Sequence, residues 1–500
     1  MFSETTVEYI FAQYRWVVVC LFLLPATFVY EIGWLFRRWY ILYTQQAPKN
    51  HPQKVNYVQN QVKARNRSHP NLPMCTARPG WQSMTLREPK YKKTMYLIEV
   101  DLKDIIKIDE SKQTVTVEPL VTMGQLTRTL NANGWSIPVV IELDDVTVGG
   151  AVMGQGVESM SHTYGLFQHI CLSYEIVVSD GSVITCSKGE NSDLYYAIPW
   201  SYGTLGFLTA VEIQMIPVTS FIKLQYHPVH SLDDMVRTYE KALSAEAKND
   251  FVETLVFTSN TAVVMTGTFV KDAPFMKQNR IGLWYKPWFF THVQKFLKWG
   301  PGYEYVPLRD YYHRHTRSLF WEIGDIVPFG NNPYFRFFLG WLMPPKVSFL
   351  KLTQTDVIKR LYDKFHMVED FLVPLKTLKE CLMYFESKVN IYPIWLCAFK
   401  LPNDPGLLHP TGEKEELFVD IGLYGEPKVK HYDSVKTTKD MELFVGDKKG
   451  YKMLYAGTHL TQAEFRMYYD HSLYDRQRKL YNAANAFPEI YDKVNRKVRD

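Results

Sequence analysis

A long run of apolar residues lies near the start of the chain, at residues 16–36, and reads WVVVCLFLLPATFVYEIGWLF. As a helix these 21 residues extend about 31 Å, which is enough to cross the hydrocarbon core of a bilayer. Pro25 and Glu31 weaken the pattern, because proline kinks a helix and a carboxylate is costly deep in lipid. Aromatic residues typical of the membrane–water interface follow the run. The pattern predicts a membrane anchor within residues 1–45.

Three forms of this anchor are open: a retained helix that spans the bilayer, a re-entrant or interfacial helix, and a cleaved signal peptide. A cleaved signal fits less well, because the run is long and no small-residue cleavage pattern follows it. Basic residues are more frequent after the run, at Arg37, Arg38, Lys49 and Lys54, than before it, at Arg15. Because positive charge favours the cytoplasmic side, we expect the body of the protein to face the cytosol.

Residues 46–72 are polar and contain Pro48, Pro52 and Pro70, with a short helical pattern at residues 55–65. We expect this stretch to be a tether between the anchor and the body of the protein.

The pattern then changes to alternating elements of an α+β unit. Strand patterns occur at residues 96–100, 114–121 and 207–216. Asp180-Gly181 separates two further β-type runs and is a signal for a two-residue hairpin. Thr122 is suited to cap a helix that Gly134 ends.

Between these elements lies a segment with four glycines, which consists of Thr147, Val148, Gly149, Gly150, Ala151, Val152, Met153, Gly154, Gln155, Gly156, Val157, Glu158 and Ser159. Glycines let a ligand approach the main chain. The only charge is that of Glu158, so a diphosphate would have to be bound by backbone N–H groups and small hydroxyls. The G-x-G-x-x-G fingerprint is incomplete. A phosphate cradle and a tight structural loop both fit this segment.

Composition narrows the class of protein. A chain of 500 residues predicts about three domains. Hydrophobic residues make up 46% and charged residues 22%, which excludes wholesale disorder. The net charge of +5 is too weak for a nucleic-acid partner. The six cysteines contain no C-x-x-C pair, which argues against a zinc ribbon and favours reduced thiols facing the cytosol.

The motifs VEPLVTMGQ, TVGG, YGLFQHI, SDGS and YGTLGF occur in an order that resembles the FAD-binding domain of the vanillyl-alcohol oxidase / p-cresol methylhydroxylase (PCMH) superfamily. The resemblance implies an α+β fold with a two-subdomain FAD-binding PCMH-type domain at residues 73–218. It implies an α+β substrate or cap domain at residues 219–430, and a C-terminal segment at residues 431–500 that closes on the FAD domain.

Further motifs along nearly the whole chain, among them MCTARPGW, YKPWFF, FWEIGDIVPFGNNP and AFPEIYDK, are similar to the delta-24 sterol reductase (Diminuto) family. This resemblance implies a flavin enzyme that uses NADPH to saturate the sterol side-chain double bond between carbons 24 and 25, as in desmosterol to cholesterol. It implies a sterol substrate and attachment to endoplasmic reticulum and Golgi membranes.

The superfamily's FAD segment maps onto residues 147–159. By position, the resemblance implies a second cofactor loop at Arg78, Pro79 and Gly80, and a third at Gly203, Thr204 and Gly206. Many members bond a His of the second loop covalently to the flavin, but no His lies between His69 and His162. We therefore expect FAD to be bound without a covalent bond.

Reduction of an isolated alkene requires a general acid in a dry pocket. Candidate catalytic residues are Tyr312, His313 and His315, with Arg314 or Arg317 as partners for a cofactor anion. The alternative interpretation is a strand on which His313 and His315 share one face and pair with neighbouring residues. No metal is expected, because no third ligand lies near the two histidines. The aromatic residues 285–290 fit either core packing or contact with a membrane.

Other functions are open as well. A related sterol side-chain reductase or isomerase would look almost identical in sequence. A flavin-dependent alcohol or aldonolactone oxidase of the same superfamily predicts flavin reduction by a sugar-type alcohol instead of NADPH. A non-catalytic membrane scaffold predicts no flavin absorbance.

Overall fold

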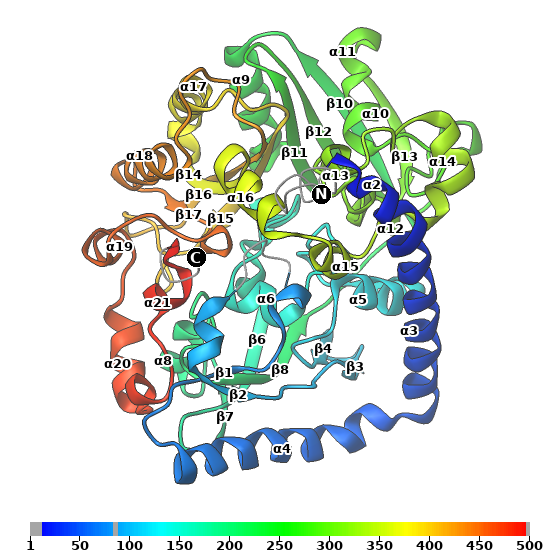
Figure 1. The fold of residues 1–500 in the computed structure, drawn as a ribbon. Helices are drawn as coiled ribbons and strands as arrows, with labels where there is room; N and C mark the ends of the chain where they lie inside the picture. Colours follow the sequence, from blue (N-terminus) through cyan, green and yellow to red (C-terminus); the bar gives the residue numbers. More distant parts are fainter. Residues whose placement is uncertain (1–12, 84–88, 497–500) are drawn as a thin grey trace, which may run out of the picture.

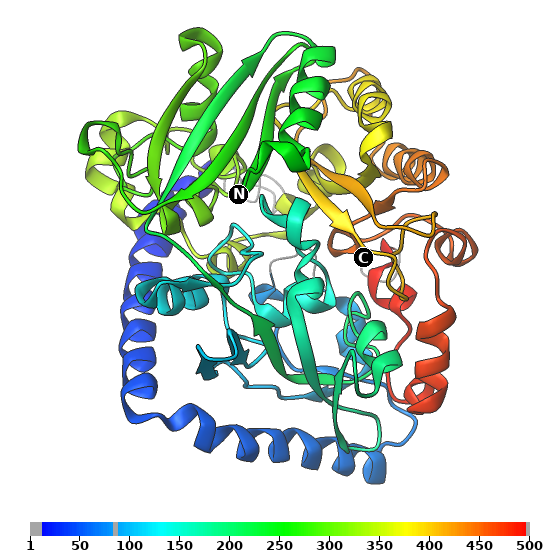
Figure 2. The ribbon, with the colours of Figure 1, turned by 180° about the vertical axis from the view of Figure 1, so that it is seen from behind.

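The computed structural model describes residues 13–83 and 89–496. It has two lobes, each built on an antiparallel sheet (Figure 1). The lower lobe holds a five-stranded sheet and the upper lobe an eight-stranded sheet. All six cysteines are free thiols. The view from behind shows the chain passing from one sheet to the other through the segment that joins β8 (Phe207–Gln214) to β10 (Phe221–Val229) (Figure 2).

The lower sheet has the strand order β3-β4-β8-β6-β7. Its other strands are β3 (Ile105–Asp109), β4 (Thr114–Val117), β6 (Cys171–Val177) and β7 (Val183–Ser187). Asp180-Gly181 turns the chain between β6 and β7, with Gly181 at a φ of +86°, so the predicted hairpin is confirmed. The predicted helix is α5 (Met123–Leu130), which Thr122 caps and after which Gly134 adopts a left-handed conformation.

Two small sheets flank the lower sheet. β1 (Met74–Thr76) and β2 (Tyr96–Ile98) form a parallel pair, and β5 (Trp135–Ser136) pairs with β9 (Ile216–Pro217). The strands expected at residues 96–100 and 114–121 are shorter than predicted. In the second case Pro119 follows the strand and has no N–H group for a further ladder bond.

The segment expected to be a tether is instead a continuous helix, α4 (Gln46–Ser68), which lies along the lower lobe (Figure 1). Val55, Val58 and Val62 share one face of this helix and are buried in the core of the lobe. Lys54 adds ion pairs to two buried carboxylates, at 2.7 Å from Asp104 and 2.8 Å from Glu118. Three valines in a polar sequence give too weak a period for this packing to be predicted.

The upper sheet has the order β13-β10-β12-β11-β15-β16-β14-β17. Its remaining strands are β11 (Phe251–Thr258), β12 (Thr261–Val270), β13 (Gly302–Pro307), β14 (Met367–Pro374), β15 (Ile394–Leu401), β16 (Glu416–Gly425) and β17 (Tyr451–Lys452). Side chains of one face pack in a core with helices α9 (Leu232–Leu243), α17 (Leu378–Lys388) and α18 (Ser434–Asp447). Side chains of the other face belong to the core that includes the lower lobe.

Shorter helices complete the two lobes. They are α6 (Val148–Met153), α7 (Ser161–Tyr164), α8 (Ser192–Ala197), α10 (Phe289–Gln294), α11 (Phe296–Trp299), α12 (Leu308–Tyr312), α13 (Ile323–Ile326), α14 (Pro333–Leu339), α15 (Val347–Leu352), α16 (Asp356–Phe365), α19 (Gln462–Tyr468), α20 (Ser472–Leu480) and α21 (Ile490–Val494). The C-terminal segment first adds α18 and β17 to the upper lobe. It then returns to the lower lobe, where α20 lies beside α8 (Figure 1).

The N-terminal apolar helix runs down the side of the molecule as α2 (Arg15–Val18), one π-helical turn and α3 (Leu24–Thr44) (Figure 1). It is bound to both lobes. Arg15 donates a hydrogen bond to the carbonyl oxygen of Leu350 in the upper lobe, at 2.6 Å. Arg37 forms an ion pair with Asp104 in the lower lobe, at 2.7 Å.

A fully buried guanidinium connects the lobes. Arg314 donates to both carboxylate oxygens of Glu253 on β11, at 2.6 and 2.7 Å, and to Glu158 of the lower lobe, at 3.2 Å. Tyr311 and Trp395 also donate to Glu253, at 3.1 and 3.0 Å. Although burial opposes ionisation, Arg314 lowers the pKa of Glu253 below its ordinary value. Burial raises the pKa of Glu158, so the charge of this network is concentrated in the Arg314–Glu253 pair.

Replacing Arg314 with Met should lower the free energy of unfolding by roughly 3–5 kcal/mol, because two carboxylates lose their buried partner. The measurement is chemical denaturation of the full chain. The exposed Arg237→Met is the control and should change stability by less than about 0.5 kcal/mol. Adding Glu253→Gln to Arg314→Met should restore part of the loss. Equal stability of the Arg314 and Arg237 variants would contradict the role of the network.

Candidate active site

The glycine-rich segment forms a capped short helix between the two lobes (Figure 1). Thr147 caps α6: its Oγ1 accepts a hydrogen bond from the backbone N–H of Gly150, at 3.2 Å. The side chains of Val148, Ala151 and Val152 are buried in the core. These residues therefore offer a ligand only their main chain.

The glycines of this segment serve different purposes. A Cβ at Gly149 would lie 2.8 Å from the side chain of Pro119, and one at Gly156 would lie 2.0 Å from a neighbouring isoleucine. The packing of the protein therefore requires both glycines. Gly150 is exposed, and a Cβ there would meet only Thr147 Oγ1, at 3.0 Å. Gly150 thus leaves space for a ligand beside its Cα, while its N–H is bonded to Thr147 Oγ1 and its carbonyl oxygen to the N–H of Gly154.

The helix ends in a strained turn with unsatisfied polar atoms. Gln155 has a φ of +150°, which is rare for a residue with a side chain. Within the described residues, neither the oxygen nor the nitrogen of its amide has a hydrogen-bond partner, and both atoms are buried. A Cβ at Gly154 would lie 2.9 Å from the carbonyl oxygen of Gly150, and Met153 accepts a hydrogen bond from Ser201. An amide with both ends free is suited to a ligand that carries adjacent donors and acceptors, as the flavin ring does.

The last residues of the segment are directed into the protein. Val157 is in the core, Glu158 faces Arg314, and the Ser159 hydroxyl donates to the Glu158 carboxylate, at 2.8 Å. The carbonyl oxygen of Ser159 accepts a hydrogen bond from the backbone of Val252 on β11, at 2.9 Å. Of this part, only the main chain is available to a cofactor, and the end of the segment is attached to the upper sheet.

The second predicted loop lies between β1 and β2 in the chain. Lys92 donates to the carbonyl oxygen of Arg78, at 2.6 Å, and the Arg78 guanidinium donates to the carbonyl oxygen of Gln82, at 2.8 Å. Pro79 is exposed, whereas Gly80 packs closely against Pro89. Arg78 thus carries a positive charge on a loop that a second cation holds in place.

The third predicted loop is bound by the C-terminal segment. The hydroxyls of Thr204 and Tyr474 lie 2.6 Å apart, and Arg478 donates to the carbonyl oxygen of Thr204, at 2.8 Å. A Cβ at Gly206 would lie 2.6 Å from a strand carbonyl, so this glycine is required by packing. Gly203 has a φ of +68°, and a Cβ there would make only ordinary contacts, at 3.8 Å from Lys493 Nζ and 3.9 Å from the carbonyl oxygen of Gly206. Gly203 is therefore the member of this loop that exposes its main chain.

The candidate catalytic segment is not a strand. Residues 308–312 form α12 and a turn follows, so His313 and His315 do not share a face. His313 Nδ1 lies 2.6 Å from Asp144, and its Nε2 lies 2.7 Å from the hydroxyl of Thr127. It is thus enclosed by groups of the lower lobe.

His315 and Tyr312 are poorly suited to deliver a proton. Burial lowers the pKa of His315 to about 4, so the imidazole is neutral at neutral pH. The ring stacks on Phe320, with centroids 4.4 Å apart, and lies against Glu253. Burial raises the pKa of the Tyr312 phenol above its ordinary value.

Arg314 and Arg317 are not available as partners for a cofactor anion. Arg314 is held by the two buried carboxylates described above. The Arg317 guanidinium donates to five backbone carbonyl groups between residues 281 and 287, at 2.9–3.2 Å. Both cations therefore have structural partners.

Sequence reasoning missed an acidic group on the upper sheet. Asp370 on β14 and Asp420 on β16 are buried, as is Glu142 in the loop that leads to the glycine-rich segment. Burial and nearby carboxylates raise the pKa of Glu142 to about 8. Asp420 stands alone in the apolar run LFVDIGLY, and an isolated acid in a strand pattern is the signal that could have indicated it.

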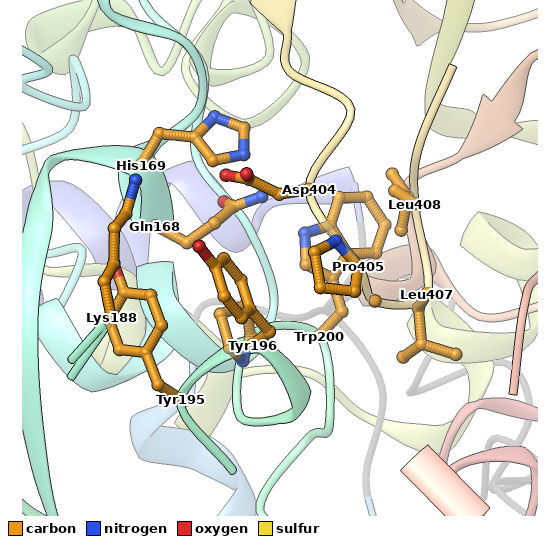
Figure 3. Close-up of a pocket in the computed structure, with 12 residues that line it drawn as sticks. Gln168, His169, Lys188, Tyr195, Tyr196, Trp200, Asp404, Pro405, Leu407 and Leu408 are labelled. Carbon is orange, nitrogen blue, oxygen red and sulfur yellow. The ribbon is translucent and has the colours of Figure 1, made fainter. Parts of the chain in front are cut away.

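A cavity of about 40 Å³ lies at another place between the lobes (Figure 3). Gln168, Tyr196 and Trp200 of the lower lobe line it together with Asp404 and Pro405 of the upper lobe. This volume holds a few water molecules and is far too small for a dinucleotide.

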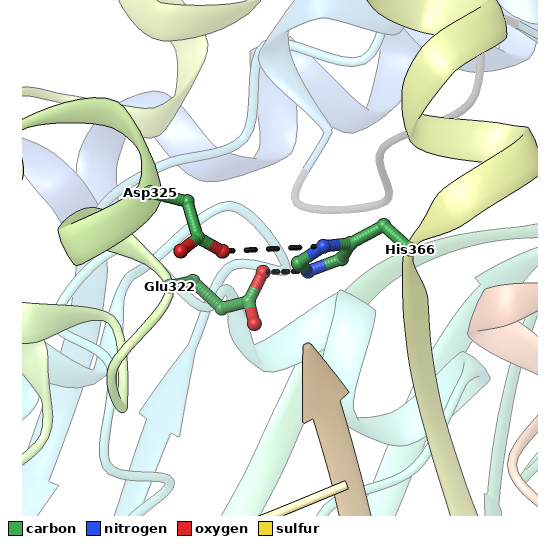
Figure 4. A group of neighbouring side chains, drawn as sticks. All are labelled: Glu322, Asp325 and His366. Carbon is green, nitrogen blue, oxygen red and sulfur yellow. Dashed lines mark hydrogen bonds and ion pairs between the residues drawn. The ribbon is translucent and has the colours of Figure 1, made fainter. Parts of the chain in front are cut away.

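Glu322, Asp325 and His366 form a separate group of three side chains with potential metal ligands (Figure 4). His366 Nε2 lies 2.6 Å from Glu322, and Tyr362 donates a hydrogen bond to the same carboxylate oxygen. Although burial opposes it, Glu322 raises the pKa of His366. The shared carboxylate oxygen is thus already engaged, which favours an ion pair over a metal site.

The comparisons with known proteins agree with this geometry. The model of the FAD binding domain family matches residues 51–187. The Delta(24)-sterol reductase of Mus musculus is 49% identical, over 98% of this chain and 95% of that protein. The Delta(24)-sterol reductase homolog dhcr-24 of Caenorhabditis elegans is 43% identical, over 99% and 97%, and the Delta(24)-sterol reductase of Arabidopsis thaliana is 38% identical, over 98% and 93%. The chain therefore belongs to the Delta(24)-sterol reductase family, and its lower lobe is an FAD-binding domain of the PCMH type.

Proposed function

We propose that this protein is an FAD-dependent sterol reductase that saturates the side-chain double bond between carbons 24 and 25, with NADPH as the hydride donor and desmosterol as a model substrate. The observation that carries the proposal is the position of the glycine-rich segment. The open space beside Gly150 and the free amide of Gln155 lie between an FAD-binding domain and a sheet whose facing side holds buried acids and aromatic rings.

Different residues would bind the cofactor and surround the reacting part of the sterol. The main chain of Gly150 and Gly203 would approach the cofactor, with Arg78 as the nearby cation and the Gln155 amide as donor and acceptor. FAD bound there supplies the hydride for the alkene carbon. An apolar surface that excludes water and presents aromatic faces to a developing cation is formed by Trp395, Phe320 and Tyr424. The ring centroid of Phe320 lies 5.2 Å from that of Trp395 and 4.9 Å from that of Tyr424.

The decisive measurement uses full-length protein purified in detergent and kept free of oxygen. The visible spectrum should show flavin, NADPH should bleach it, and desmosterol should restore it. Cholesterol has the same ring system and a saturated side chain, so it should not restore the colour. Bleaching by sugar-type alcohols alone would support the oxidase alternative, and absence of flavin would support the scaffold.

Gly150→Val should weaken FAD binding by about tenfold or more, because its side chain fills the open space beside the main chain. The matched control is Gly189→Val, since Gly189 also has open space around it but lies in a surface loop after β7. Flavin content and thermal midpoint are measured for both. Equal flavin content in the two variants would contradict the cradle.

We further propose that the protein attaches to endoplasmic reticulum and Golgi membranes from the cytosolic side, with α3 lying in the plane of the membrane surface. The most apolar 18-residue window of the segment from Arg15 to Thr44 has a mean hydropathy of 1.9, which is enough to span, and 17% of that window is buried. Its contacts with Leu350 and Asp104 would have to break for α3 to leave the body. Lys346 adds an ion pair with Glu31, at 3.1 Å.

A second apolar surface continues the face of α3. Tyr334, Phe337 and Phe338 of α14 are 64–78% exposed. Trp341 follows this helix and packs against Phe28 of α3, with ring centroids 5.2 Å apart. Two neighbouring apolar surfaces on one side of the molecule favour insertion of both into the interface. The aromatic residues 285–290 are divided, since Tyr285 is exposed whereas Trp288 and Phe289 are in the core.

Replacing Phe337 and Phe338 together with Ser should lower vesicle binding by about tenfold or more, because two large apolar side chains no longer enter the lipid. Met383→Ser on α17, at the opposite side of the molecule, is the control for an exposed apolar residue and should leave binding unchanged (Figure 1).

An N-terminal tag should be digested by protease added to intact microsomes. Protection of the tag would instead indicate a spanning helix.

A further inference from the structure

Asp420 is a buried acid without a partner. It lies in the middle of β16 at 1% exposure, and neither of its carboxylate oxygens has a hydrogen-bond partner among the described residues. An unpaired buried carboxylate is costly, so such a group is kept for a reason other than packing.

Strand register shows where Asp420 points. It pairs with Leu372 of β14 and Cys397 of β15, and both of these side chains belong to the core shared with the FAD-binding domain. Its neighbours Val419 and Ile421 belong to the core on the other side, with α9, α17 and α18. Because side chains alternate along a strand, the carboxyl group faces the FAD-binding domain.

Asp370 lies diagonally across from Asp420 on the same face. It pairs with Gly422, where a Cβ would lie 2.9 Å from Asp370 Oδ1. The hydroxyls of Tyr424 and Tyr455 donate to its two oxygens. Asp370 is thus held as a hydrogen-bond acceptor, which is the state of an ionised carboxylate.

The surroundings keep the two acids in different protonation states. Burial raises the pKa of Asp370 to about 6. Burial, the charge of Asp370 and that of Glu142 raise the pKa of Asp420 well above its ordinary value. Two adjacent carboxyl groups with separated pKa values are typical of an acid and its supporting base. The other titratable groups around Asp420 are Cys397, Tyr424, Tyr455 and Tyr239 of α9.

We propose that Asp420 is the proton donor of the sterol reduction, and that the charge of the neighbouring Asp370 keeps it protonated. This role rests on the proposed function. The π electrons of the alkene take the proton of the Asp420 carboxyl group and form the new C–H bond at the less substituted carbon. The tertiary carbon, left electron-deficient, receives the hydride, whose two electrons come from NADPH. Asp420 remains as a carboxylate and regains a proton from solvent.

The experiment separates the two half-reactions of the full-length, FAD-loaded protein. NADPH should bleach the flavin of Asp420→Asn at the wild-type rate, whereas re-oxidation by desmosterol should be about 100-fold slower or worse. The control is Glu416→Gln, which removes a carboxylate at the start of the same strand, where it faces Lys376 at the surface. This control should re-oxidise like the wild type.

Asp370→Asn provides a readout that a structural role would not change. In the wild type, re-oxidation should be lost as pH rises through the pKa of Asp420. Removal of the neighbouring charge lowers that pKa, so the loss should occur at a lower pH in Asp370→Asn.

Stability gives a readout independent of activity. The folded protein holds the Asp420 proton to a higher pH than the unfolded chain does, so this group lowers stability as pH rises above about 4. Asp420→Asn has no proton to lose. Its thermal midpoint should exceed that of the wild type by about 2 °C or more near pH 8, and the difference should shrink toward about pH 5.

The outcomes distinguish failure of the proton-donor role from failure of the proposed function. Re-oxidation of Asp420→Asn by desmosterol at the wild-type rate would overturn the proton-donor role and leave the proposed function intact. A lower thermal midpoint at all pH values would show a structural residue and also overturn it. Failure of desmosterol to re-oxidise the wild type would instead overturn the proposed function.

Discussion

The buried Arg314 network is the interaction on which the arrangement of the two lobes depends. A guanidinium with no exposure is held by Glu253 of the upper sheet and Glu158 of the FAD-binding domain. Burying such a group is costly unless all its partners are in place. The network therefore stabilises only the arrangement of the lobes in which Arg314 contacts both carboxylates. Glu158 is the next-to-last residue of the glycine-rich segment, and this docking therefore also sets the cofactor loop against the upper sheet.

The position of the loop explains why the facing side of the upper sheet is chemically unusual. Most of its side chains pack as an ordinary core, but Asp370 and Asp420 interrupt that core with acids. In a dry site a carboxyl group is held neutral by burial and by a neighbouring charge, and a neutral acid can supply the proton that an isolated alkene needs. Of the histidines that resemble general acids in sequence, His313 bonds to Thr127 and Asp144 of the lower lobe, and His315 is packed within the upper lobe.

The N-terminal helix is the part of the chain that the proposed membrane attachment uses. Contacts at Arg15 and Arg37 bind it to both lobes, and α14 extends its apolar face. In the attachment proposed above, a helix bound along the body would place the body against the lipid surface. That arrangement suits an enzyme whose substrate is dissolved in the bilayer.

The sequence alone determined the hairpin at Asp180-Gly181, the cap of α5 at Thr122, the apolar N-terminal helix and the FAD-binding class of the lower lobe. These features depend on residues close together in the chain, so local patterns reveal them. Only the tertiary structure decided that the polar α4 is packed, that Arg314 and Arg317 are structural, and that Asp370 and Asp420 meet on one face. Each of these depends on partners dozens to hundreds of residues away, and burial and charge pairing exist only after the two lobes have docked.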